Sequence, residues 1–125
     1  AYYDGSELCI IHPDGTGKRS LGIYDLEWGV LASWYPDSKG LVASRLGKIY
    51  AVSLEGSKAK LLGRGYRPIL NPTGTMLTYC DHESGYGALY MMKSNGQGRR
   101  QLCPNPQNTY PSWSPDGGRL AYDDK

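Results

Sequence analysis

One short run of side chains has residue types that could hold a metal ion or transfer protons: Asp81, His82 and Glu83. The run lies between two strand-like segments, in a connection longer than its counterpart between Tyr2 and Gly15. Neighbouring residues on a loop seldom point at one ion, and no second histidine or carboxylate cluster accompanies them at a ligand-like spacing. We therefore expect no catalytic residue, no metal site and no cofactor. A hydrolase or lyase with a site around His82 is the alternative.

The other motifs add no chemistry. The short Gly-x-Gly strings open no helix, so none is a phosphate-binding loop, and the sequence has no G-x-S-x-G motif. Three cysteines without a C-x-x-C pair fit buried strand residues better than a zinc site or a disulfide framework. A net charge of +2 without a concentrated basic patch gives no reason to expect nucleic acid. No apolar run is long enough to enter a membrane, and the first residues lack a signal-peptide pattern.

The elements that would position any site come from an internal repeat. A first unit, a short apolar run, a proline turn and a second apolar run, occurs at Ser33–Ala43, Ile69–Tyr79 and Ser112–Tyr122. A second unit, with Asp-Gly, Glu-Gly or Asn-Gly between apolar runs, occurs at Leu8–Leu21, Ile49–Leu62 and Leu89–Leu102. Proline at a turn and glycine after a polar residue both favour tight hairpins. Each period of about 40 residues therefore predicts four strands, a to d, which is one β-propeller blade.

We therefore predict an all-β protein, a propeller of four-stranded antiparallel blades with about three blades per chain. The repeats run over approximately 1–43, 44–79 and 80–122, within a single propeller segment 1–125. The stretch Tyr110–Tyr122 (YPSWSPDGGRLAY) resembles the repeat signature of TolB-type, WD-repeat-like propellers. This resemblance implies a six- or seven-bladed ring, commonly periplasmic or secreted, that binds other proteins.

The strand phase suggests how the ring is completed. Ala1–Tyr2 aligns with Ala121–Tyr122 as the end of strand b, so three blades with matching ends follow one another. Three blades do not close a ring. We predict a homodimer of two half-rings, in which strand b, Arg119–Asp123, pairs with strand c, Glu7–Ile11, of the other copy. The alternatives are that further blades of a longer chain complete the ring, or that the chain is an excised or engineered fragment without a function of its own.

Two sets of residues follow from this register. Trp34, Leu70 and Trp113 hold matched positions in strand a, and we expect them to be largely buried between blades in the assembled form. The b–c and d–a loops emerge on one face of a propeller, and loops on a rigid scaffold often bind partners. Because aromatic and arginine side chains favour interfaces, this face is the expected binding surface. Its residues are Trp28, Arg64, Tyr66, Arg67, Asp81, His82, Glu83, Tyr86 and Tyr110.

Overall fold

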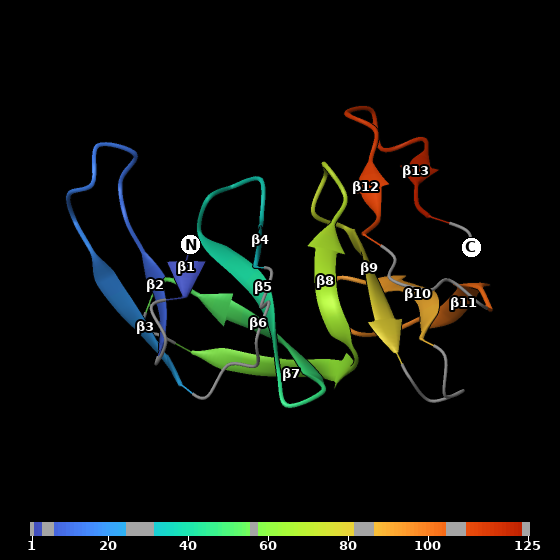
Figure 1. Cartoon of the computed structure of the whole chain (residues 1–125), viewed down its shortest axis with the longest axis horizontal. Coiled ribbons are helices and arrows are strands. Elements are labelled where there is room, and N and C mark those ends of the chain that lie inside the picture. The colour runs from blue at the N-terminus through green and yellow to red at the C-terminus, as the bar shows by residue number, and fades with distance from the viewer. Residues whose placement is uncertain are drawn as a thin grey trace.

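The computed structural model describes residues 2–3, 7–24, 32–55, 58–81, 87–104 and 110–123. These residues form thirteen strands and no helix, arranged as antiparallel sheets that stand side by side along the molecule (Figure 1). The strands are β1 (Tyr2–Tyr3), β2 (Glu7–Ile10), β3 (Arg19–Tyr24), β4 (Ser33–Trp34), β5 (Gly40–Arg45), β6 (Lys48–Ser53), β7 (Ala59–Arg64), β8 (Tyr66–Leu70), β9 (Met76–Asp81), β10 (Ala88–Lys93), β11 (Arg100–Cys103), β12 (Ser112–Trp113) and β13 (Leu120–Ala121).

The order of strands confirms the predicted propeller blades. Two sheets are complete, β4-β5-β6-β7 and β8-β9-β10-β11, and each runs a, b, c, d. The sheet β1-β2-β3 contains the end of strand b followed by c and d, and β12-β13 contains a and b. The described strands therefore form an arc of blades, and they follow one another in the order a, b, c, d that the repeats predicted.

The predicted pairing of Arg119–Asp123 with Glu7–Ile11 is wrong in its extent. Tyr2 already lies opposite Cys9, and Tyr3 lies opposite Leu8. β1 therefore already occupies the strand b position beside Leu8 and Cys9. A strand from another copy could not pair with these two residues of β2.

The turns between strands a and b follow from their sequence. In each, a backbone N–H closes a four-residue turn that contains the proline, as Gly117 N donates to Ser114 O at 2.8 Å. The fourth residue has a positive φ, 61° at Ser38, 71° at Gly74 and 71° at Gly117. In the second repeat, Asn71 stands at the position of Ser114. Its Oδ1 accepts from Thr75 N at 2.9 Å and from Met76 N at 3.1 Å. The sequence departure thus keeps the turn through a different side chain.

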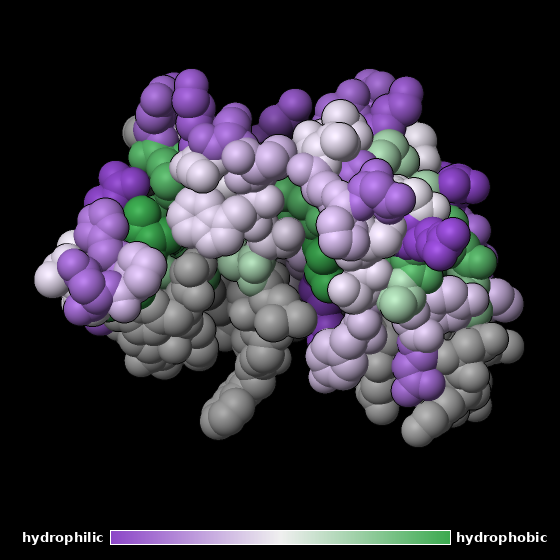
Figure 2. Space-filling model, turned by 90° about the horizontal axis from the view of Figure 1, so that it is seen from above, coloured by the Kyte–Doolittle hydropathy of each residue, from purple (hydrophilic) through white to green (hydrophobic). Residues whose placement is uncertain are grey.

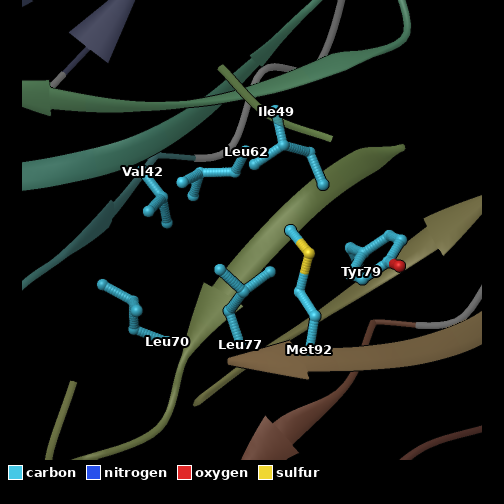
Figure 3. Close-up of a cluster of buried hydrophobic side chains, with 7 residues drawn as sticks. All are labelled: Val42, Ile49, Leu62, Leu70, Leu77, Tyr79 and Met92. Atoms are coloured by element: carbon cyan, nitrogen blue, oxygen red, sulfur yellow. The ribbon is translucent and has the colours of Figure 1, made fainter. Parts of the chain in front are cut away.

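The core lies between blades rather than within one. One cluster joins the two complete blades through Val42, Ile49, Leu62, Leu70, Leu77, Tyr79 and Met92 (Figure 3). A second joins the first two blades through Leu8, Leu21, Leu41, Ala43 and Val52. Successive residues of β5 therefore enter different clusters, because neighbouring side chains on a strand point to opposite faces. Strand b is buried on both faces, whereas the outer strand β7 has the pattern of an exposed strand.

In this single arc, the two strand a tryptophans are not fully buried. Trp34 and Trp113 hold matched register positions, since they pair with Leu41 and Leu120, yet Trp34 is 40% exposed and Trp113 is half-buried. Leu70, at the same position, is 6% exposed. Trp113 leans on the preceding blade, where its Nε1 donates to Ile69 O at 3.4 Å. Among the described residues, the sheet that precedes Trp34 has no strand a, so the equivalent support for this indole is missing.

The inter-blade core gives a test of stability. Replacing Leu77, which is fully buried between the complete blades, by alanine should cost about 2–5 kcal/mol in the free energy of unfolding, because a cavity remains. Leu61 is 53% exposed on β7, and Leu61→Ala should change it by less than about 0.5 kcal/mol. Urea denaturation of both variants measures the difference. Equal losses would contradict the placement of the core between blades.

Candidate binding face

The turn from β5 to β6 and the link from β7 to β8 lie along the lower edge of the sheets in Figure 1. We call this side of the molecule the loop face. Of the residues predicted to line it, the structure describes Arg64, Tyr66, Arg67, Asp81 and Tyr110. The predictions for Trp28, His82, Glu83 and Tyr86 lie outside the described residues.

Arg67 has an unusual backbone on this face. Its φ is 54°, in the left-handed region that arginine seldom adopts, at a register shift between β8 and β9. Ser44 of the preceding blade supports the bulge, because its Oγ accepts from Arg67 N at 3.3 Å. The bulge places the guanidinium over the Tyr110 ring, 4.6 Å from its centroid, and the Tyr110 side chain is 60% exposed. A cation and an aromatic ring from two successive blades are thus presented together at the surface.

A hollow of about 260 Å³ opens nearby, where the b–c turn of one blade meets the d–a link to the next. Its lining combines cationic and aromatic side chains with one buried carboxylate: Leu46, Gly47, Lys48, Arg64, Tyr66 and Asp81. The turn at Leu46 and Gly47 has φ values of 48° and 71°, as a two-residue type I′ hairpin requires. This tight turn leaves the hollow open between β5–β6 and β8.

Asp81, at the edge of the hollow, forms an ion pair with Arg99. Arg99 Nη2 donates to Asp81 Oδ2 at 2.8 Å, and the Asp81 side chain is only 4% exposed. The guanidinium lies 4.3 Å from the centroid of Tyr90, which stacks on Tyr79 with 5.7 Å between ring centroids. Charge and hydrogen bonding make such a pair strong where water is excluded. Asp81 is therefore held in a structural network.

The described part of the chain contains no group of three or more histidine, cysteine, aspartate or glutamate side chains that could hold a metal ion. The predicted cluster of Asp81, His82 and Glu83 is described only at Asp81. Its carboxylate faces Arg99, so a cation at this oxygen would compete with the guanidinium.

Sequence reasoning missed Arg99 and Lys48. Arg99 lies next to β11 and reaches the loop face only through the packing of its blade, so its spacing along the chain gave no signal. Lys48 follows Leu46-Gly47, where a glycine between two apolar strands could have indicated a tight b–c hairpin.

The two complete blades are joined by one residue. β7 ends at Arg64 and β8 begins at Tyr66, so Gly65 alone makes the d–a connection. Its φ is 142°, its N–H donates to Gly47 O at 2.9 Å, and a Cβ there would lie 2.4 Å from Tyr79 Cδ2. Glycine is required by both the backbone angle and the lack of space.

Comparison with known proteins agrees with this architecture. No family model matches the chain. A crystal structure of TolB from Acinetobacter baumannii superposes with a TM-score of 0.80 at 18% identity, over 91% of this chain and 31% of that one. The structure of a putative TolB from Agrobacterium tumefaciens superposes with a TM-score of 0.77 at 25% identity, over 94% of this chain and 45% of that one. The chain has a TolB-like β-propeller fold.

Other similarities bear on the extent of the TolB-like segment. An uncharacterized protein of Agrobacterium fabrum, Atu1656, is 31% identical over 130 residues, which is 88% of this chain and 44% of the relative. A nidogen/laminin complex chain has a TM-score of 0.74 at 13% identity and is covered to 48%. An oligogalacturonate lyase in complex with manganese has a TM-score of 0.63 at 17% identity and is covered to 36%. The segment thus spans less than half the length of each of these proteins.

Membrane insertion was not expected from the sequence. The described residues contain no helical stretch with the length and hydropathy needed to span a bilayer.

Gly65 gives a test of the close link between blades. Gly65→Ala should cost roughly 2 kcal/mol or more in the free energy of unfolding, because the methyl group meets Tyr79 and the backbone angle disfavours alanine. Gly15→Ala is the matched control, since Gly15 has a φ of 85° but nothing within 4 Å of its Cβ position. The control should lose only about 1–2 kcal/mol from backbone strain. Equal losses in urea denaturation would show that the contact with Tyr79 is unimportant.

Tyr79 gives a test by pH. Burial raises the pKa of Tyr79 to about 12 from 10.0, although the charge of Arg99 acts to lower it. Because this phenol ionises more readily in the unfolded chain, its contribution to stability is complete below pH 10.0 and is lost as pH rises toward about 12. Tyr79→Phe should therefore flatten the alkaline loss of stability between these values. An unchanged slope in urea denaturation across this pH range would contradict the buried phenol.

Proposed function

We propose that this TolB-like segment is a non-catalytic binding scaffold that engages another protein through its loop face. The observation that carries the proposal is the contact between half-buried Arg67 and exposed Tyr110, held across two blades by a left-handed backbone at Arg67. Residues in such sparsely populated conformations are concentrated at functional sites. Arginine and tyrosine are also enriched among the residues that dominate binding energy in interfaces.

The charges of the described loop face indicate the chemistry of the partner. Lys48 and Arg64 line the hollow, and Arg67 lies on the same side of the molecule. The carboxylate of Asp81 is bound by Arg99 and offsets little of this charge at the surface. Cationic side chains beside exposed tyrosine rings favour an acidic segment that also carries aromatic residues. We propose such a segment as the ligand.

The scaffold is completed, in this proposal, by a second copy that closes a six-bladed ring. What supports this is the strand phase of the sheets and the fact that the segment spans 31–48% of the matched propeller chains of known structure. Further blades of a longer chain are the competing way to close the ring. A periplasmic or secreted location belongs to the same proposal and rests on the family resemblance alone.

The lyase similarity does not add a second function. At 17% identity, the similarity to the lyase supports a shared fold only. His82, the residue at the centre of the hydrolase or lyase alternative, lies outside the described residues. The described side chains supply no observation that favours catalysis over binding.

The proposal is tested with a fluorescent random copolymer of glutamate and tyrosine as the probe, followed by anisotropy. Arg67→Ala should weaken binding by about tenfold, because a charged contact beside an aromatic ring is lost. Arg100→Ala is the matched control, since it removes one exposed arginine on the outer strand β11. It should leave binding within about twofold, and rising salt should weaken the wild-type complex. Equal weakening by both variants, or no binding by the wild type, would contradict a specific loop face.

A further inference from the structure

A groove of about 560 Å³ opens on the first complete blade, at the opposite end of its strands from the loop face. Its lining includes Tyr35, Lys39, Gly40, Ala51, Lys58 and Lys60, and we call it the turn groove. The a–b turns rise at the top of Figure 1, and Figure 2, which views the molecule from above, shows apolar patches between mostly hydrophilic residues. The volume of the groove is within the range of small-molecule sites, which is about 300–1,000 Å³.

Comparison of the repeats explains why this blade has a groove. Ala51 lies in β6 at the position that Ile10 holds in β2 and Met91 holds in β10. In the second complete blade, the Met91 side chain fills this position and is 9% exposed. Ala51 has only a methyl group there and is half-buried. The first complete blade therefore lacks a large apolar side chain that both of the other repeats have.

A second small residue, Gly40, deepens the groove. It is the first residue of β5, whereas the matching residue of the second complete blade, at the start of β9, is Met76. A Cβ at Gly40 would lie 2.6 Å from the Val52 carbonyl oxygen, so glycine alone fits this position. The groove therefore has a floor of backbone and small side chains.

Lysine side chains surround this floor. Lys60 pairs with Ala51 across β7 and β6, so both side chains stand on the same face of the sheet. Lys58 lines the groove just before β7, and Lys39 lines it from the a–b turn, where its N–H donates to Asp37 Oδ1 at 2.9 Å. All three lysines are exposed, and the lining contains one carboxylate, that of Asp37. The charge around the groove is therefore positive.

Tyr35 adds an aromatic ring and a hydroxyl group to the lining. Its place is fixed from two sides, because its N–H donates to Gly40 O at 3.0 Å and its ring packs against the core cluster between the complete blades. Burial raises the pKa of the Tyr35 phenol, and the charge of Asp37 acts in the same direction. The phenol therefore stays protonated at neutral pH and can donate a hydrogen bond to an anion.

We propose that the turn groove binds a small organic acid, whose apolar body rests on Ala51 and whose acid group lies beside Lys58 and Lys60. The apolar body takes the volume that the Met91 side chain fills in the second complete blade. An inorganic anion would leave the apolar floor uncovered, and an uncharged molecule would gain nothing from the lysines. This binding goes beyond the proposed function, since the turn groove shares no residue with the loop face.

The probe for this site is naphthoate, an aromatic ring with one carboxylate, titrated into the 125-residue chain at low salt and followed by heteronuclear NMR. Binding should saturate and should shift the amide signals of Ala51 and Lys60. Ala51→Met should weaken binding by about tenfold or more, because the new side chain fills the groove as Met91 does in the next blade. Lys60→Gln should weaken it by about threefold, because one exposed charged contact is lost.

Two matched variants and a second probe serve as controls. Ala121→Met and Lys93→Gln change an exposed alanine and an exposed lysine outside the groove, and both should bind naphthoate like the wild type. Naphthylmethylammonium, with the same ring and the opposite charge, should not bind. No binding by the wild type, unchanged binding by Ala51→Met, or equal weakening by Lys60→Gln and Lys93→Gln would overturn the proposal. The two lysine variants decide the question even if Ala51→Met does not fold.

Discussion

The structure depends on the burial of strand b on both of its faces. In β5, Leu41 and Ala43 pack toward the preceding blade, and Val42 packs toward the following one. A single sheet of this kind cannot bury its apolar residues alone, so each blade is stable only between neighbours. The position of both core clusters between blades follows from this requirement.

The repeat made most of the fold predictable. Proline turns and polar-glycine pairs recur with the period of one blade, and their positive φ values appear at Gly15, Gly74 and Gly96. Such local signals depend on backbone geometry, which neighbouring blades hardly alter. The strand order could be predicted for the same reason, because hairpins fix which strands are adjacent.

The loop face was less predictable because it depends on contacts between blades. The left-handed conformation of Arg67 comes from a bulge supported by Ser44 in another blade, and Arg99 reaches Asp81 across its own sheet. Neither relation has a fixed spacing in the sequence. The partial exposure of Trp34 in the single arc has a related cause. Its position in the repeat predicts burial, but burial also requires a preceding strand a, which the described first sheet lacks.

The one-residue link at Gly65 has a consequence for the order of folding. Bringing β7 and β8 together closes almost no loop, so the entropy lost on docking these two blades is small compared with blades joined by longer connections. We therefore expect the Val42, Leu77 and Met92 contacts between these blades to form before the contacts with the partial sheets. The two complete blades thus make a natural nucleus, onto which the partial sheets at either end add as later steps.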